Sequence, residues 1–461
     1  MNSEYNKDTV LIVGAGISGL AAAWFLNKRG RDVVVLEKSE RPGGCLWTIR
    51  KKGFLIEWGP NSFLSSAAEL VSLAGDLGLR DDMVITQPGK SARYIFKDGR
   101  LIPVPTGPIS FLSSPLLGLK SKLRLLTEPF AISRPPAEEE SLADFCRRKA
   151  GQDMVDNMAG PFVSGVYAGD SEKLSATAAF PRLAQAQQLS ASVMRGFKKL
   201  RKNNPSPDTG LPRGSMGSFC SGMGQLSAAL HDRLGDCIHL NTEVVKITHS
   251  ADGYEVSTRS GGDAKIWRAG HVIFALSCRD AAGLLQDLDP LLGDLLDKIP
   301  TAGVAAVYTG YQESYLHRPL DGFGFLVSRK EKLQLLGSIW SSALFPDRAP
   351  EGSAAMTNFI GGSLNAAILE ESDEDIKKQV FVDLGVTMSL ECEPDFVHLQ
   401  RHQKIFPQYN IGHCDNIQSI ENALQRYPGL HLTGNYLRGI SVADCIKQAR
   451  ILVSGIVDRG S

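Results

Sequence analysis

The sequence predicts an α/β protein, α+β overall, and three features of the chain lead to this fold class. The N-terminus alternates strand, helix and strand: an apolar run at 9–14 ends in glycine, 17–29 has the pattern of a helix, and 33–37 is a second buried strand. A central stretch, about 108–202, has helical patterning and few strand signals. Strand patterns then return at 243–248, 254–258, 272–276, 303–310, 323–327 and 335–340, before a final strand, glycine turn and helix over 429–455.

The composition argues against several classes of protein. Fifty basic and 50 acidic side chains cancel, so no overall field favours a nucleic-acid partner. The eight cysteines form no CxxC pair and no cluster with zinc spacing, which favours reduced thiols and no metal site. There is no secretory signal, and no apolar run approaches the roughly 18–20 residues of a spanning helix. We therefore expect a cytoplasmic protein, soluble or peripheral on the cytoplasmic membrane face; a homodimer is compatible with the sequence.

Three glycines connect the first strand to the first helix. Gly14, Gly16 and Gly19 form G-x-G-x-x-G, in which the first permits a tight turn, the second lets a pyrophosphate approach the backbone, and the third lets helix and strand pack. The helix start supplies free N–H groups for phosphates. Glu37 closes the second strand, where a carboxylate can accept a ribose hydroxyl. The spacing predicts a Rossmann-like dinucleotide site; the alternative is a glycine-rich turn in an α/β protein without a nucleotide.

The residues after Glu37 indicate which dinucleotide is bound. The continuation E-K-x-x-R-x-G-G resembles the flavoprotein monoamine-oxidase and phytoene-desaturase superfamily, whose members bind FAD. Residues 431–448 are similar to the C-terminal FAD segment of that superfamily, and "NTEVVKI" is similar to its adenine-side strand, although its valine can also be an ordinary strand residue. The resemblance implies FAD contacts at Gly14, Ala15, Gly16, Ile17, Ser18, Gly19, Glu37, Lys38, Arg41, Gly43, Gly44, Gly59, Pro60, Asn61, Ser62, Val244, Asn435, Ile440, Ser441 and Val442.

The stretch "EWGPNSF" at 57–63 combines a turn signal with apolar flanks. Gly59 tolerates positive φ and Pro60 fixes its own φ, so the pair predicts a turn. The resemblance implies that this turn lies along the isoalloxazine ring, with Asn61 near its reactive edge as a catalytic residue. The alternative for Asn61 is a side chain that caps the turn.

Further motifs narrow the resemblance. "GPNSF", "PFVSGVYAGDSEKLS", "GFGFLV", "LFPDRAP", "NFIGG" and "IFPQYNIGH" together resemble the oxygen-dependent, FAD-containing protoporphyrinogen IX oxidases, close to the plant mitochondrial type. This resemblance implies an oxidoreductase of haem biosynthesis that converts protoporphyrinogen IX to protoporphyrin IX, with FAD taking a hydride in each step and oxygen as acceptor. A coproporphyrinogen III oxidase, a flavin amine oxidase and a protein with this fold but no redox turnover remain as alternatives.

The same resemblance implies the substrate contacts. Arg93, on a strand before the Asp98-Gly99 turn, is expected to hold a propionate and to act as a second catalytic residue; otherwise it is a solvated arginine. Gly165 is expected to bring its backbone close to the macrocycle. The implied walls, which could also be plain core residues, are Phe323, Leu326, Ile339 and Phe359. Cys45 and Ser164 depart from the residues common in relatives, and this leaves the FAD contact and the pocket polarity there in doubt.

We divide the chain into three discontinuous domains. Residues 1–87, 222–300 and 401–461 are assigned to a Rossmann-like FAD-binding domain, and 88–107, 203–221 and 301–400 to a mixed-sheet substrate domain. Residues 108–202 are assigned to a helical, membrane-facing domain. Within it, 115–130 spaces Leu116, Leu119, Leu123, Leu126 and Phe130 at three- and four-residue steps between basic residues, and 195–204 adds a basic cluster. Such a helix can lie on an anionic membrane or pack on its own domain.

Overall fold

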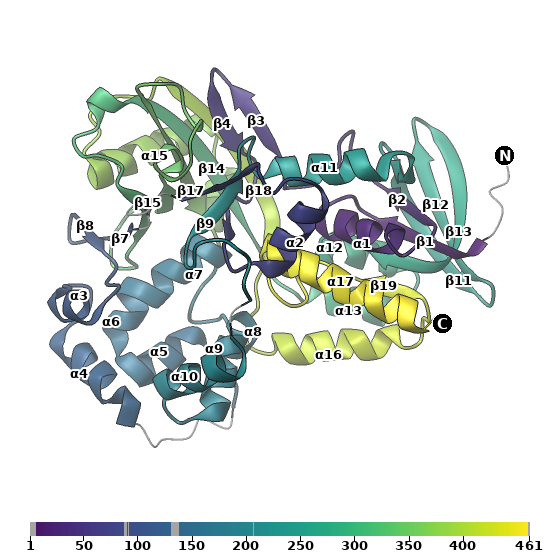
Figure 1. Cartoon of the computed structure of the whole chain (residues 1–461), viewed down its shortest axis with the longest axis horizontal. Helices are drawn as coiled ribbons and strands as arrows, with labels where there is room; N and C mark the ends of the chain where they lie inside the picture. The colour runs from purple at the N-terminus through teal and green to yellow at the C-terminus, as the bar shows by residue number, and fades with distance from the viewer. Residues whose placement is uncertain (1–5, 87–89, 91, 131–137, 206, 460–461) are drawn as a thin grey trace.

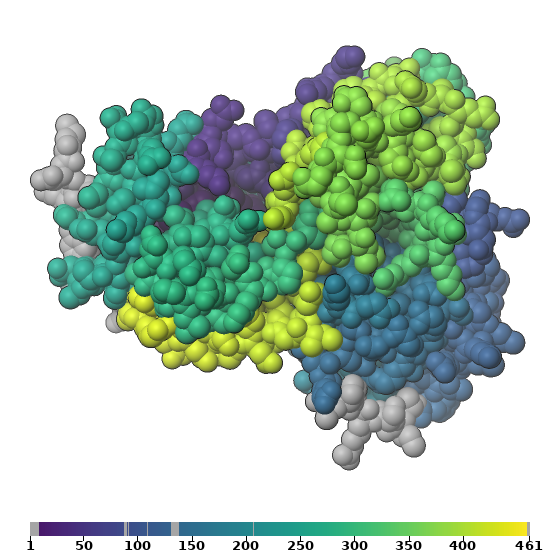
Figure 2. All heavy atoms as spheres, turned by 180° about the vertical axis from the view of Figure 1, so that it is seen from behind, coloured from purple at the N-terminus to yellow at the C-terminus, as the bar shows by residue number. Residues whose placement is uncertain are grey.

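Two seven-stranded sheets and a lobe of helices make up the protein, as seen in a computed structural model (Figure 1). The structure describes residues 6–86, 90, 92–130, 138–205 and 207–459. In the space-filling view from behind, the helical lobe (blue) lies against the part built from residues of the second sheet (green) (Figure 2). No helix in the described ranges is long and apolar enough to cross a membrane.

The first sheet contains the predicted strand–helix–strand unit. Its order is β10-β2-β1-β13-β12-β11, with β19 paired to β13, and β1 runs parallel to both β2 and β13. Helices on both sides bury β1, which explains its continuous apolar run. The strands are β1 (Asn6–Val13), β2 (Val33–Leu36), β10 (Ile238–His239), β11 (Glu243–Ser250), β12 (Gly253–Ser260), β13 (Asp263–Phe274) and β19 (Leu430–Leu432).

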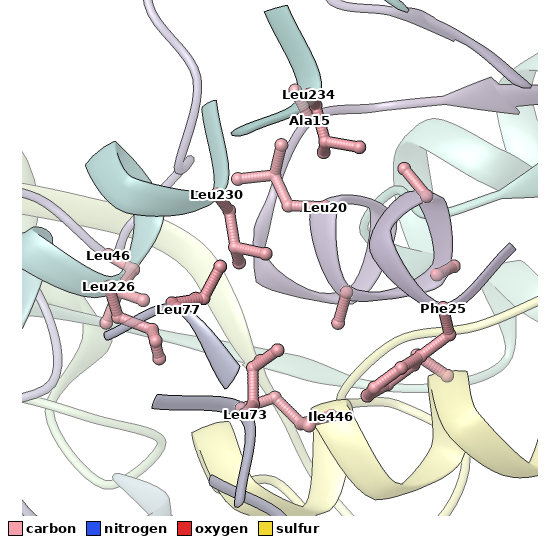
Figure 3. Packing of buried hydrophobic residues seen from close by; sticks show 14 of the residues in the cluster. Ala15, Leu20, Phe25, Leu46, Leu73, Leu77, Leu226, Leu230, Leu234 and Ile446 are labelled. Carbon is pink, nitrogen blue, oxygen red and sulfur yellow. The ribbon is translucent and has the colours of Figure 1, made fainter. Parts of the chain in front are cut away.

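Helices from distant parts of the chain pack together against this sheet. In the core shown in Figure 3, Phe25 and Leu20 of α1 (Ile17–Asn27) meet Leu73 of α2 (Ala68–Asp76), Leu230 of α11 (Gly224–Leu234) and Ile446 of α17 (Val442–Arg459). A second core cluster joins the sheet to α12 (Cys278–Leu285), α13 (Pro290–Asp297) and α16 (His413–Leu424). The N-terminal and C-terminal segments therefore form one packed unit.

The second sheet is mixed and has the order β18-β14-β17-β16-β15-β7-β8. Helix α15 (Asp373–Met388) covers one face through a core that includes Ile376, Val380 and Leu384. The strands are β7 (Ala92–Lys97), β8 (Arg100–Pro103), β14 (Thr301–Gln312), β15 (Gly322–Val327), β16 (Leu335–Ile339), β17 (Ser353–Gly361) and β18 (Phe396–Pro407). Because β18 continues to Pro407, residues 401–407 belong to this sheet.

The central stretch is helical, as predicted. Its elements are α3 (Pro108–Ser113), α4 (Leu119–Thr127), η1 (Glu128–Phe130), α5 (Leu142–Ala150), α6 (Gln152–Met154), η2 (Val155–Ala159), α7 (Gly160–Tyr167), α8 (Ala176–Ala179), α9 (Pro181–Leu189) and α10 (Val193–Asn203). Smaller pieces join the parts: the hairpin β3 (Thr48–Lys51) and β4 (Phe54–Glu57), the sheet of β5 (Phe63–Leu64), β6 (Met83–Ile85) and β9 (Met216–Phe219), α14 (Ser341–Leu344), and the short turns η3 (Gly235–Cys237), η4 (Glu313–Tyr315) and η5 (Ala366–Glu370).

The predicted strands of both sheets are confirmed, with small differences at their ends. Strands β10, β17 and β18 were not predicted, and β9 begins inside the segment 203–218 that was expected to be a connection. Leu116 also departs from the expected exposed stripe, because it is buried before α4 begins.

Candidate active site

The glycine turn after β1 has the geometry that the spacing predicts. Gly14 adopts φ +101°, which favours glycine. A Cβ at Gly19 would lie 2.0 Å from the carbonyl oxygen of Gly14, so only glycine lets α1 pack on the strand. A Cβ at Gly16 would meet no atom within 4 Å. The second glycine thus borders open space beside the start of α1, where an anionic group can approach the backbone.

The carboxylate of Glu37 faces this turn. It is buried and accepts hydrogen bonds from the backbone N–H of Ala15 at 2.7 Å and of Ser39 at 2.9 Å. Each carboxylate oxygen keeps a second lone pair for a ribose hydroxyl. Glu37 therefore holds the glycine turn in shape in addition to its predicted role.

The segment after β2 runs beside the same turn. Gly43 donates its N–H to the carbonyl of Ala15 at 2.7 Å, and Gly44 adopts φ +56° next to Gly16. The guanidinium of Arg41 donates to the carbonyl of Gly44 at 3.0 Å and stacks on the ring of Trp47 at 3.7 Å. Two other predicted FAD contacts use their side chains elsewhere: Lys38 lies 3.6 Å from Asp280, and the hydroxyl of Ser18 bonds to Cys445. At these two positions only the backbone is available.

The predicted flavin loop, 58–62, begins at a buried acid. Glu57 accepts hydrogen bonds from the Thr48 hydroxyl at 2.6 Å and the Met223 N–H at 2.9 Å. Burial raises its pKa to about 7, and these two bonds and the charge of Arg348 oppose the shift. Within the loop, Asn61 donates its side-chain N–H to the carbonyl of Gly59 at 3.2 Å. The structure thus places Asn61 in the capping arrangement, with its other amide atoms left for a ligand.

The C-terminal segment is held by contacts with the end of β18. Asn435 donates its side-chain N–H to the carbonyl of Ile405 at 3.4 Å, and its own carbonyl accepts from the Tyr409 hydroxyl at 2.5 Å. Ser441 caps α17 by accepting from the Asp444 N–H at 3.1 Å. The positive end of α17 therefore starts at the predicted contacts Ile440, Ser441 and Val442. Val244 lies apart from them on β11, buried in the core beside the first sheet.

The strand register brings four predicted substrate residues to one face of the second sheet. Arg93 pairs with Gly324, which pairs with Ile339 on the next strand. Two residues further along β15, Leu326 pairs with Gly337, which pairs with Phe359. Because paired residues point to the same face and residues two apart on a strand do as well, Arg93, Leu326, Ile339 and Phe359 share the face opposite α15.

Two more predicted residues lie close to this face. The ring of Phe323 lies 5.5 Å from the guanidinium carbon of exposed Arg93. Gly165 of α7 is so near β15 that a Cβ there would come within 2.3 Å of the Leu326 side chain. A hollow of about 500 Å³ opens beside β8 and α3, but none of its described lining residues belongs to the predicted site. The candidate site is therefore the sheet face between α7 and loop 58–62.

The chain matches a known protein family over most of its length. The model of the family described as flavin containing amine oxidoreductase matches residues 17–455. The chain belongs to this family. It is 31% identical to a coproporphyrinogen III oxidase of Bacillus subtilis (strain 168), covering 97% of both chains. It is 34% identical to the chloroplastic protoporphyrinogen oxidase of Oryza sativa subsp. japonica, covering 97% of this chain and 88% of that protein.

The fold agrees with the family. A crystal structure of a protein from Exiguobacterium sp. 255-15 superposes with a TM-score of 0.83 at 26% identity, covering 98% of this chain and 99% of the other. This flavin-containing amine oxidoreductase family member is an oxidoreductase with FAD as its cofactor. The residues present fit FAD: the open space at Gly16 and the start of α1 suit its pyrophosphate, and the spare lone pairs of Glu37 suit its ribose.

Two residues of this region were not assigned from the sequence. Tyr409 donates its hydroxyl to the carbonyl of Asn435. It lies in the motif "IFPQYNIGH", but nothing in the sequence indicates which residue this tyrosine contacts. His402 lies on β18, a strand whose polar run "HLQRHQK" hides the alternation that would have revealed it.

Proposed function

We propose that this enzyme oxidises protoporphyrinogen IX to protoporphyrin IX with oxygen as the acceptor. The observation that carries the proposal is the sheet face described above, which combines one cation with apolar walls. Arg93 is exposed at one edge and Ile339, Leu326 and Phe359 continue the face. A macrocycle with an apolar rim and propionates on one side has matching chemistry, because a guanidinium binds carboxylates with two parallel hydrogen bonds.

The residues of this chain would bind, orient and shield, while FAD supplies the redox chemistry by taking a hydride and passing electrons to oxygen. Arg93 would fix the propionates and thereby the distance of the ring from the cofactor. Asn61 would lie at the ring edge of the flavin, and Gly165 would let α7 close over the macrocycle. The proposed FAD contacts are those given above, and the three-domain division is proposed with residues 401–407 moved from the FAD-binding to the substrate domain, because they continue β18.

Coproporphyrinogen III is the second candidate substrate. The observation that favours it is the Bacillus subtilis relative named coproporphyrinogen III oxidase, which matches over 97% of both chains. Its substrate differs from protoporphyrinogen IX by propionates in place of vinyl groups. Arg93 is the one cation among the predicted substrate residues, and this balance favours the substrate with fewer carboxylates.

The test compares the two substrates at equal enzyme concentration by the rise of porphyrin fluorescence. We expect a higher kcat/KM with protoporphyrinogen IX. A higher kcat/KM with coproporphyrinogen III would replace the proposal by its alternative, and no porphyrin from either substrate, with oxidation of an amine instead, would overturn both.

We also propose that the helical lobe contacts an anionic membrane. Exposed apolar side chains lie on three neighbouring elements, α3, α4 and η1: Ile109, Leu112, Leu119, Leu123, Leu126 and Phe130. Basic residues flank them on α4 and on α10. Buried Glu128 joins the two regions, because its carboxylate accepts from the Ser192 hydroxyl at 2.9 Å and the Val193 N–H at 2.6 Å. Apolar insertion with basic flanks suits a cytoplasmic leaflet.

Vesicles test this surface. Replacing Leu119 and Leu123 by serine should reduce pelleting with anionic vesicles, whereas the same change at Leu291, which is 52% exposed on α13, should not. Pelleting should also fall with added salt, since charges are screened beyond about 8–10 Å at physiological ionic strength. Equal pelleting of both variants would overturn the proposal. We also propose that the protein forms a homodimer, which sedimentation would test.

A further inference from the structure

His402 is a buried side chain on the candidate site face that the proposed function leaves unused. It pairs with Val304 on β14, and Ala306, two residues along, pairs with Phe359. The strand register therefore places His402 on the same face as Phe359 and Arg93. It is 7% exposed, and its Nε2 has no hydrogen-bond partner among the described residues. A buried polar atom without a partner is rare enough to require an explanation.

The strand around His402 contacts both segments that hold the flavin. A backbone interaction with Trp58, which directly precedes the predicted flavin residues 59–62, raises the pKa of His402. Three residues further on, the carbonyl of Ile405 accepts from the side chain of Asn435. The register of β14 and β18 shifts between Ala302 and Val304, and Lys404 adopts φ +54°. Such a bulge re-aims side chains next to active sites, and here it lies directly after His402.

The ring is arranged as a proton acceptor. Its Nε2 has no hydrogen-bond partner among the described residues, so a lone pair on this atom is open to a ligand N–H when the imidazole is neutral with its proton on Nδ1. Burial lowers the pKa of His402 and the Trp58 interaction opposes this, with burial the larger effect. No charged side chain among the described residues shifts the pKa of His402, whereas Lys51 and Lys377 lower the pKa of His398. A neutral imidazole at pH 7 can accept a proton.

We propose that Nε2 of His402 accepts the proton of a ring N–H group at the junction of cofactor and substrate. This inference rests on the proposed function for the identity of the reaction. Each two-electron oxidation breaks one C–H and one N–H bond of the porphyrinogen and forms a C=N bond. The C–H hydrogen leaves as hydride to FAD, and the N–H proton passes to Nε2, which becomes imidazolium. Oxygen then takes the two electrons, the hydride hydrogen and the proton of His402 and becomes hydrogen peroxide.

The ring N–H can belong to the substrate or to the flavin, and magnetic resonance separates the two. The imidazole nitrogens of isotope-labelled histidine are followed in the apoprotein, in the FAD-loaded enzyme and after addition of protoporphyrin IX. The His402 signal is assigned by its loss in His402→Gln. A change of the Nε2 signal on FAD loading identifies the flavin as the partner, and a change only with the porphyrin identifies the substrate. No change in either step overturns the proposal.

Kinetics supply a second readout. The acid limb of the kcat/KM profile, which reports protonation of His402, should disappear in His402→Gln, and the rate should fall by about 100-fold or more. His249→Gln is the control, since His249 is exposed on β11 of the first sheet, away from the candidate site face. An acid limb that survives in His402→Gln overturns the proposal. If no porphyrin forms at all but FAD loading still shifts Nε2, the proposed substrate fails and the flavin contact stands.

Discussion

Replacement of Glu57 by glutamine should change how the stability of this protein depends on pH. Glu57 is 4% exposed at the end of β4, where its carboxylate bonds to Thr48 and Met223 and its carbonyl accepts from the Tyr308 hydroxyl. It thereby ties the start of α11 and the second sheet to the predicted flavin loop. The acid lies near buried Arg348, whose own pKa burial lowers.

The magnitude follows from the pKa. Burial raises the pKa of Glu57 from 4.5 to about 7 in the folded protein. The folded state therefore binds the proton more tightly than the unfolded state, and the resulting stability is present at low pH and is lost as pH rises through about 7. Integrated from pH 5 to pH 8, this loss is about 2–3 kcal/mol.

The measurement is urea unfolding of the FAD-saturated enzyme at pH 5 and pH 8. Glu57→Gln keeps an acceptor for the Met223 N–H, places an amide N–H where the carboxylate accepts from the Thr48 hydroxyl, and does not titrate. The stability of wild type minus that of the variant should therefore fall by about 2–3 kcal/mol between the two pH values. Glu40→Gln, at an exposed position, is the control. If wild type and Glu57→Gln show the same pH dependence, the carboxylate does not titrate in this range and the reasoning fails.

Three further predictions concern the cofactor and the substrate. Gly16→Val should fold but lose FAD, because its side chain meets no protein atom and fills the space proposed for the pyrophosphate. Gly19→Ala should instead destabilise the apoprotein, because its Cβ would lie 2.0 Å from the carbonyl oxygen of Gly14. Thermal melts and flavin absorbance distinguish the two variants. Glu37→Ala should retain FAD more weakly in dialysis, with some loss of stability from the turn. Arg93→Ala should raise KM by about tenfold or more and lose the preference for free over esterified propionates, while Arg100→Ala should not; an unchanged preference would remove Arg93 from the site.

The first sheet was predictable because its signals are local. Gly14, Gly16 and Gly19 combine a strand end, a turn and a helix start within six positions, and each glycine has a separate steric or ligand reason. Strand β18 was not predictable, because its polar and apolar residues do not alternate regularly. Its side chains face solvent, the side of α15 and the candidate site. The pairing of the Glu37 carboxylate with two backbone N–H groups also depends on tertiary placement that no spacing reveals.

The sequence could not predict that the substrate residues share one face of the second sheet. Their common face depends on the register between neighbouring strands, which their positions in the sequence do not reveal. Phe359 and Leu326 are far apart in sequence, and only the pairing of each with Gly337 aligns them. Gly324 likewise stands between Arg93 and Ile339. In both rows a glycine separates two larger residues, and the two glycines lie on the neighbouring strands β15 and β16. A Cβ at Gly337 would lie 2.9 Å from the Leu326 side chain, and one at Gly324 would lie 1.9 Å from the Ser338 carbonyl oxygen. Glycine is thus required by the packing of the sheet at both positions, and this requirement, which no local spacing reveals, brings the four predicted substrate residues onto one face.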